Sequence, residues 1–262
     1  RIWTDLLTQE RYTFDISTQI WSVAPFTVDL LHAGLSLMAG GDARSAMNLG
    51  LAILLLLLMA GILRRLNTPV WTQWLLIVLM ATTPMLGNLL LTLQTELTLA
   101  VMALAGMRLV IDANGGWRGQ HVLGVLSCAA LCASIKLPGA VLGVTLLAAL
   151  AVRWLSQREI PTPTGHMLRW SALLLLIPLG FVALHSYGVA WKLTGNPVFP
   201  LYNAIFLSPY YDPINFSDSR WIHGFGLTSY VKAFFHTSEF FESGDYTAGW
   251  QYLIMLPIGV LA

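Results

Sequence analysis

Long apolar runs, each closed by a short polar segment, dominate the chain from residue 45 onward. The clearest is LAILLLLLMAGIL, which is followed directly by Arg64 and Arg65. A helix rises 1.5 Å per residue, so a run of about 20 residues matches the roughly 30 Å hydrocarbon core of a bilayer. We therefore expect about six membrane-spanning helices and the start of a seventh. They fall at Ser45–Leu63, Val70–Gly87, Glu96–Ile111, Gln120–Ile135, Pro138–Trp154 and Trp170–Trp191, with the seventh beginning at Trp250–Ala262.

Two other segments do not fit a full span. Ile20–Ala39 is apolar but carries Pro25, Asp29 and His32, so we expect a helix that lies against or dips into the membrane. The segment from Lys192 to Gly249 is long, polar and aromatic, with many turn residues. Long connections of this kind are usually functional or disordered, and so many aromatic residues argue against disorder. We expect it to fold as a cap of short helices, with an amphipathic helix over Val231–Phe241.

Composition indicates a membrane protein. The chain is 56% hydrophobic and 10% charged, with a mean hydropathy of +0.67, whereas about a quarter of the residues of a soluble domain are charged. A net charge of +1 gives no indication of a nucleic-acid partner. Because residue 1 is not Met and residue 262 falls inside an apolar run, we expect an internal piece of a longer chain. The expected fold class is an all-α integral membrane protein, a polytopic helix bundle with a cap loop of short helices.

The distribution of charge predicts the orientation. With Arg64 and Arg65 in the cytoplasm, the inner loops hold seven basic and two acidic residues, and the outer side holds seven basic and eleven acidic residues. This excess of positive charge on the inside is what the positive-inside rule requires. We therefore expect residues 1–44 to be part of a first periplasmic loop with a membrane-associated helix, and 45–191 to be the bundle. Residues 192–249 are then a periplasmic cap loop, and 250–262 begin a further span.

Two isolated charges are the main candidate functional groups. Glu96 is the only charged residue between Arg65 and Arg108, and Lys136 is the only one between Arg118 and Arg153. A charge in hydrocarbon costs roughly 2.5–3.5 kcal/mol even on the lenient insertion scale, so such ions usually mark a functional site. Helices of about 16–18 residues would place both at sunken outer ends. A structural ion pair, or a lysine that reaches the headgroups, is the alternative.

Several motifs, taken in order, resemble a known family. They are PFTVDLLHAGLSLMAGG (Pro25–Gly41), a double-basic turn, a Thr-Pro-x-Leu sequence, LCASIKLP (Leu131–Pro138) and TGNPVFPLYN (Thr194–Asn203). Together they resemble bacterial polytopic glycosyltransferases of the C-type (GT-C) superfamily, whose relatives include protein O-mannosyltransferases and the aminoarabinose transferases of lipid A. The last motif is fairly specific, whereas each of the others is weak on its own.

The resemblance implies a hexosyl- or pentosyltransferase of the bacterial inner membrane that faces the periplasm. Such enzymes move a sugar, with inversion, from a polyprenyl-phosphate donor to a lipid, polysaccharide or protein acceptor in the cell envelope. A carboxylate acts as base, and cations hold the lipid phosphate. Glu96 and Asp29 are then the expected catalytic residues. The expected substrate-binding residues are Lys136, Lys192, Asn196, Tyr202, Asn203 and Arg220.

The sequence departs from the family at one point and leaves other classes open. The family's principal catalytic Asp lies in the first outer loop, and neither Asp5, Asp15 nor Asp29 sits in its usual setting. A secondary transporter would also carry isolated charges in the membrane. A glycan polymerase or ligase and a non-catalytic assembly subunit are further alternatives. The sequence predicts no metal-binding cluster, yet it leaves open whether a divalent metal takes part, and it does not identify the sugar or the acceptor.

Overall fold

The computed structural model is all-helical, with 73% of residues in helices and no strand among the residues that it describes. Those residues are 2–112, 119–156, 166–218, 226 and 228–261. They form two compact units, one built from residues 1–43 and 98–216 and the other from 44–97 and 217–262. The predicted all-α fold class is confirmed at this level.

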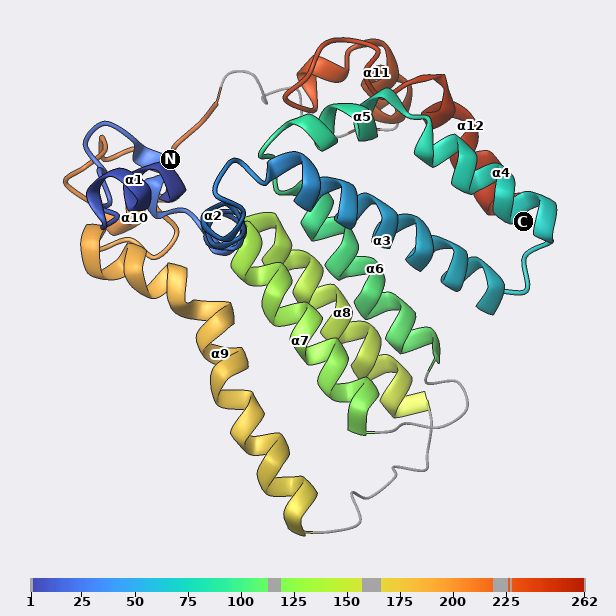
Figure 1. Ribbon diagram of the computed structural model, residues 1–262, viewed down its shortest axis with the longest axis horizontal. Helices are drawn as coiled ribbons and strands as arrows, with labels where there is room; N and C mark the ends of the chain where they lie inside the picture. The colour runs from blue at the N-terminus through green and yellow to red at the C-terminus, as the bar shows by residue number, and fades with distance from the viewer. Residues whose placement is uncertain (1, 113–118, 157–165, 219–225, 227, 262) are drawn as a thin grey trace. The chain divides into compact units, whose positions relative to one another are not determined.

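The centre of the first unit is a helical hairpin made by α7 (Gly119–Ile135) and α8 (Leu137–Ser156), with only Lys136 between them. Figure 1 shows the two helices side by side and antiparallel. The pair Gly139 and Gly143 makes this packing close. A Cβ atom on Gly139 would lie 2.0 Å from the carbonyl oxygen of Cys132, and one on Gly143 would lie 2.8 Å from that of Ala129. Small residues four apart are a common device for close helix contact in membranes.

The first unit also contains α6 (Glu96–Asp112) from Thr98 onward, and α9 (His166–Thr194). Gly106 of α6 faces Leu146 of α8, and a Cβ there would lie 2.7 Å from a leucine methyl group. The hydroxyl of Tyr187 on α9 donates a hydrogen bond of 2.8 Å to the carbonyl oxygen of Ala133 on α7. These contacts join α6 and α9 to the α7–α8 hairpin.

The N-terminal segment of this unit consists of α1 (Ile2–Gln9), η1 (Ile20–Val23) and α2 (Thr27–Ala39). A small apolar core joins it to the end of α9 and to the segment that follows, which also contains α10 (Asn203–Phe206). Its buried members are Ile16, Val23, Ala190 and Phe199. Helix α2 ends at Gly40, which has a φ of 68° and a backbone N–H that bonds to carbonyl groups of the last turn. Glycine adopts this left-handed conformation at little cost, and it commonly ends helices.

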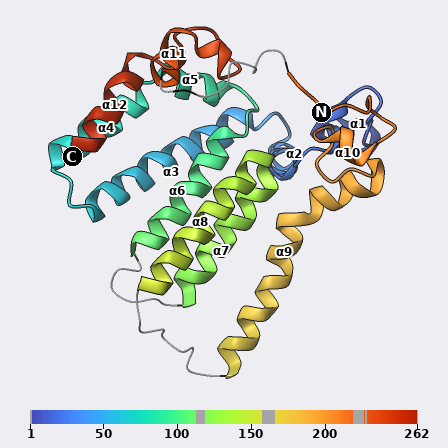
Figure 2. The same cartoon turned by 180° about the vertical axis from the view of Figure 1, so that it is seen from behind.

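The second unit contains α3 (Arg44–Arg65), α4 (Val70–Ala81), α5 (Pro84–Leu91), α11 (Ser229–Phe235), η4 (Thr237–Glu239) and α12 (Trp250–Leu261). Figure 2 shows α12 alongside α4. The Gln251 side chain on α12 donates a 2.9 Å hydrogen bond to the carbonyl oxygen of Thr82, at the break between α4 and α5. That carbonyl would otherwise lack a helical partner, because the N–H of Leu86, four residues further on, bonds to Thr83 instead.

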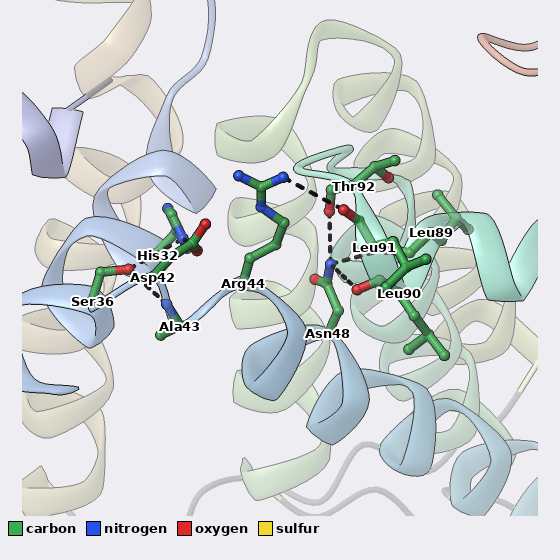
Figure 3. Close-up of polar contacts among 10 residues, drawn as sticks. All are labelled: His32, Ser36, Asp42, Ala43, Arg44, Asn48, Leu89, Leu90, Leu91 and Thr92. Atoms are coloured by element: carbon green, nitrogen blue, oxygen red, sulfur yellow. Dashed lines mark hydrogen bonds and ion pairs between the residues drawn. The ribbon is translucent and has the colours of Figure 1, made fainter. Parts of the chain in front are cut away.

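Asn48 fixes α3 against the end of α5 (Figure 3). Its side chain is 2% exposed, and its Nδ2 atom donates to the carbonyl oxygens of Leu89 at 2.9 Å and Thr92 at 2.7 Å. One turn earlier, Arg44 Nη1 lies 3.5 Å from the carbonyl oxygen of Leu91. The last carbonyl groups of a helix have no partner within the helix, so these side chains supply one.

Among the described residues, fewer helices meet the requirements of a membrane span than the six that the sequence predicted. Two helices are long and apolar enough to cross a bilayer, Arg44–Arg65 and Leu174–Thr194, and α4 with α5 makes a third if this pair, bent by 51°, counts as one span. Helices do occupy the other predicted positions, but those are shorter or less apolar. The amphipathic helix predicted over Val231–Phe241 was wrong in its extent, because α11 ends at Phe235 and a 3₁₀ turn follows His236.

Candidate functional site

A cavity of about 600 Å³ lies within the first unit, formed by the N-terminal segment. Most residues of its wall are consecutive in the sequence. They belong to the loop before η1, to η1 and to the start of α2. Ile20–Val23 turns the chain as a single 3₁₀ turn, and Pro25 then leads into α2. The lining residues are Ile2, Tyr12, Thr18, Gln19, Ile20, Trp21, Ser22, Ala24, Pro25, Phe26 and Asp29.

Asp29 is the only acidic residue of this lining. It lies in the first turn of α2, and its neighbours Val28 and Phe26 are buried. Burial raises the pKa of the Asp29 carboxyl, because a low-dielectric setting disfavours the charged form. A carboxyl group whose pKa lies closer to neutrality is better suited to accept a proton in a reaction.

Aromatic rings and polar atoms complete the wall. Trp21 is 50% exposed, and its ring lies 4.9 Å, centroid to centroid, from that of Phe216 in an edge-on arrangement. Phe26 packs edge-on against His185 of α9 at 5.2 Å. The hydroxyl of Ser22 is buried and has no hydrogen-bond partner among the described residues. The cavity thus combines a carboxyl group, a hydroxyl group with unused capacity and a partly exposed indole ring.

A polar cluster lies one turn further along α2 (Figure 3). The His32 ring is 4% exposed, and its Nε2 atom lies 2.9 Å from Oδ1 of Asp42 and 3.1 Å from Oγ of Ser36. The backbone N–H of Ala43 donates to the same Ser36 oxygen at 3.1 Å. An ionised carboxylate only accepts hydrogen bonds, so the proton of the His32–Asp42 bond sits on Nε2.

The two isolated charges of the apolar runs occupy helix ends. Glu96 is the first residue of α6 and is half-buried, while Lys136 is exposed at the break between α7 and α8. Glu96 belongs to the second unit and Lys136 to the first, so the expectation that they share one site remains a prediction. Lys192 lies exposed in the last turn of α9. The predicted phosphate-binding residue Arg220 lies outside the described residues.

Asn196 and Asn203 have structural partners. Both are completely buried. The Nδ2 atom of Asn196 donates to the carbonyl oxygen of Leu201 at 2.8 Å, and its Oδ1 atom accepts the N–H of Val198 at 3.0 Å. The Nδ2 atom of Asn203 lies 3.0–3.2 Å from three carbonyl oxygens, those of Ser208, Tyr211 and Asp212. These contacts hold the loop together and leave the amides little capacity for a ligand, so they lend no support to the predicted substrate contacts.

Tyr202, between them, is 53% exposed and adopts a φ of 53°. Its ring is accessible, and its role in binding stays a prediction.

Several residues of the cavity were not singled out in the sequence, notably Tyr12, Trp21 and Ser22. Nothing in their spacing marks them, because the loop that gathers them has no period. The His32–Asp42 pair could have been suspected, since a histidine in an apolar helix needs a polar partner. Comparison of the chain with protein-family models, with curated protein sequences and with solved structures found no match.

Proposed function

We propose that this protein is a polytopic glycosyltransferase of the bacterial inner membrane that takes a sugar from a polyprenyl-phosphate donor. The observation that carries the proposal is Asp29, a carboxyl group of raised pKa in the wall of a cavity that also offers an indole ring and a hydroxyl group. Sugars present both hydroxyl groups and apolar C–H faces, which a wall of this composition can contact. The family resemblance of the motifs from Pro25 to Asn203 supports the same class.

In the proposed reaction, an acceptor hydroxyl attacks the anomeric carbon of the donor sugar. The new C–O bond forms as the bond from that carbon to the phosphate oxygen breaks, and the configuration inverts. The hydroxyl proton passes to the Asp29 carboxylate, and the polyprenyl phosphate leaves with the electron pair. A base held within reach of its proton contributes typically 10²–10⁴-fold to such a step.

The remaining charged residues take supporting roles in this proposal. Lys136, Lys192 and Arg220 neutralise the phosphate as its charge grows in the transition state. Glu96 is the second acidic group, which orients the acceptor or shares the role of base. The proposed arrangement has about six spans, with the cavity and the segment from 192 to 249 on the periplasmic side, in contact with membrane lipids.

The test uses the full chain in nanodiscs, with a panel of polyprenyl-phosphate sugars and acceptor-rich membrane extract. We expect wild-type protein to release sugar from one donor, Asp29→Asn to lose at least about a hundredfold in rate, and Glu96→Gln and Lys136→Ala to be impaired. Asp212→Asn is the matched control, because this exposed carboxylate lies outside the cavity lining. Turnover in Asp29→Asn equal to that of Asp212→Asn would refute the role of Asp29. No turnover of any lipid-linked sugar would favour transport or assembly.

A further inference from the structure

We propose that the turn between α3 and α4 is a binding surface for anionic phospholipid. Arg64 and Arg65 hold the lipid phosphate groups, and Trp71 and Trp74 lie among the headgroups and the upper part of the acyl chains. We call these four residues the turn surface. The inference goes beyond the proposed function, because it holds whichever reaction the protein carries out. It is carried by the length of α3, the geometry of the turn, the exposed face of α4 and the local excess of positive charge.

The length of α3 places the two arginines at a bilayer surface. The helix has 22 residues and is one of those long and apolar enough to cross a membrane. At 1.5 Å per residue it is about 33 Å long, close to the roughly 30 Å hydrocarbon core of a bilayer. Arg64 and Arg65 are its last two residues, and both side chains are exposed. When the apolar part of α3 occupies the core, these guanidinium groups lie at the level of the lipid phosphates.

The turn that follows α3 is closed by hydrogen bonds, and Figure 1 shows that it leads directly into α4. The N–H of Thr68 donates to the carbonyl oxygen of Leu63, and the N–H of Asn67 to that of Arg64, both at 3.1 Å. Asn67 has a φ of 57°, and a left-handed residue with this pair of bonds is a common helix end. The Gln73 side chain donates to the carbonyl oxygen of Thr68 at 2.7 Å. These bonds fix the direction in which α4 leaves the turn, so its first residues stay next to the arginines.

Helix α4 presents an aromatic face directly after this turn. Trp71 is 68% exposed and Trp74 is 64% exposed, and their spacing of three residues puts them on one face of the helix. The opposite face is buried and carries Thr72, Leu76 and Leu79. Large exposed apolar groups that lie together mark a surface for a partner or a membrane, and Trp is enriched at the level of the lipid headgroups. Because the end of α3 sets this same level, the membrane interface is the setting that fits both helices.

The charge around the turn surface favours an anionic partner. Neither α3, α4 nor α12, which packs against α4, contains an acidic residue within its described bounds. The sequence has no charged residue between Arg65 and Glu96. Guanidinium groups bind phosphate oxygens through paired N–H donors. An anionic phospholipid supplies a phosphate for the arginines and an apolar chain for the indole rings in one molecule, at the depth that α3 sets.

The experiment identifies the lipids around Trp71 and Trp74 in nanodiscs that hold the full chain. Every nanodisc contains equal fractions of phosphatidylcholine and phosphatidylglycerol, and one of the two lipids carries bromine on its acyl chains. Bromine quenches Trp fluorescence only at close range. Because the chain has ten Trp residues, each protein is compared with its counterpart that also carries Trp71→Phe and Trp74→Phe, and the difference is the signal of the pair. The measured quantity is the ratio of quenching by brominated phosphatidylglycerol to quenching by brominated phosphatidylcholine.

The expected ratios depend on the arginines. We expect wild-type protein to give a ratio of roughly five or more, because a basic residue near an anionic membrane surface raises the affinity about fivefold. Arg64→Gln with Arg65→Gln should bring the ratio close to one, and Arg64→Lys with Arg65→Lys should keep it well above one because the charge remains. The matched control, Arg11→Gln with Lys232→Gln, removes the same charge from exposed side chains elsewhere and should keep the wild-type ratio.

A measurement at high salt makes the same comparison without any substitution. Salt screens exposed charges, so the wild-type ratio should fall toward one, whereas a ratio that does not change would count against the inference.

Three results with the variants would overturn the inference. A wild-type ratio near one would mean that the indole rings contact lipid without a preference for the anion. No quenching by either lipid would mean that the turn surface lies away from the bilayer, and would favour a protein partner. An equal fall of the ratio in both Gln double variants would be an effect of total charge. None of these results requires sugar transfer, so the inference and the proposed function can each fail while the other stands.

Discussion

The substitution Gly139→Ala tests the packing of the α7–α8 hairpin. The added Cβ atom would lie 2.0 Å from the carbonyl oxygen of Cys132 and 2.9 Å from a methyl group of Leu99, whereas ordinary contacts of a Cβ begin at 3.4 Å. The leucine methyl can rotate away, but the oxygen belongs to the backbone of α7. The two helices must therefore separate locally to admit a single methyl group.

The cost follows from this separation. Overpacking a tight interface typically costs about 1–3 kcal/mol and occasionally more. A gap of about 0.5–1 Å already removes a quarter to a half of the dispersion energy of the atoms on either side. Alanine is intrinsically better in a helix by about 1 kcal/mol, which offsets part of this loss. Because the clash is with backbone, we expect a cost at the upper end of that range, which the alanine preference reduces to a net destabilisation of about 2 kcal/mol.

Two further substitutions should change the stability by different amounts, so that the prediction covers an order of variants. Gly143→Ala should cost less than Gly139→Ala, because its Cβ would lie 2.8 Å from the carbonyl oxygen of Ala129. Gly188→Ala, on α9, is the matched control, because no atom lies within 4 Å of the added Cβ. It should be neutral or stabilising by up to about 1 kcal/mol.

The assay is unfolding by SDS in mixed micelles, followed by near-UV circular dichroism for all four proteins. The expected order of midpoints, from lowest to highest, is Gly139→Ala, Gly143→Ala, wild type and Gly188→Ala. A Gly139→Ala midpoint at or above that of wild type would refute the reasoning.

Three other predictions concern single side chains. Asn48→Ala should lower the free energy of unfolding by about 2–3 kcal/mol, because the carbonyl groups of Leu89 and Thr92 lose their donor, and SDS titration measures this loss. Asp29→Asn should stabilise the fold at neutral pH. Because the pKa of Asp29 is raised in the folded protein, the stability of wild type falls as the pH rises from the unfolded pKa to the folded pKa. The difference in melting temperature between the variant and wild type, measured by thermal shift, should therefore vanish in acid. Tyr187→Phe should cost about 1 kcal/mol in the same SDS titration, through the lost bond to Ala133; no loss would show that this bond is not stabilising.

The sequence predicted helices well where the apolar run was long. Arg44–Arg65 forms one helix because thirteen consecutive apolar or small residues leave no residue that could end it earlier. The break near Thr82 and Thr83 was not predicted, because the expected span Val70–Gly87 runs through Pro84. In the structure it starts a new helix, as proline often does at a first turn.

The candidate site was predictable only in part. Asp29 could be selected because it lies in the Pro25–Gly41 motif that carries the family resemblance. Trp21 and Ser22 could not, since a loop without a repeating pattern gives no information on which side chains converge. Asn196 and Asn203 were predicted to bind substrate because they lie in a motif. The motif gives no information on side-chain direction, and in the structure both amides donate to backbone carbonyl groups.

Helix α2 carries both residues that stabilise the fold and a residue that is a candidate for chemistry. Its interior face carries Val28, Ala33 and Ser36, which pack and bond without titrating. The same face carries His32, and Asp29 stands beside it at the cavity. A buried histidine is costly unless a partner satisfies it, and an apolar residue of similar size would meet the packing requirement alone. Because the chain instead places a histidine bonded to Asp42, and a serine that accepts the N–H of Ala43, this face of α2 also holds the loop that follows the helix.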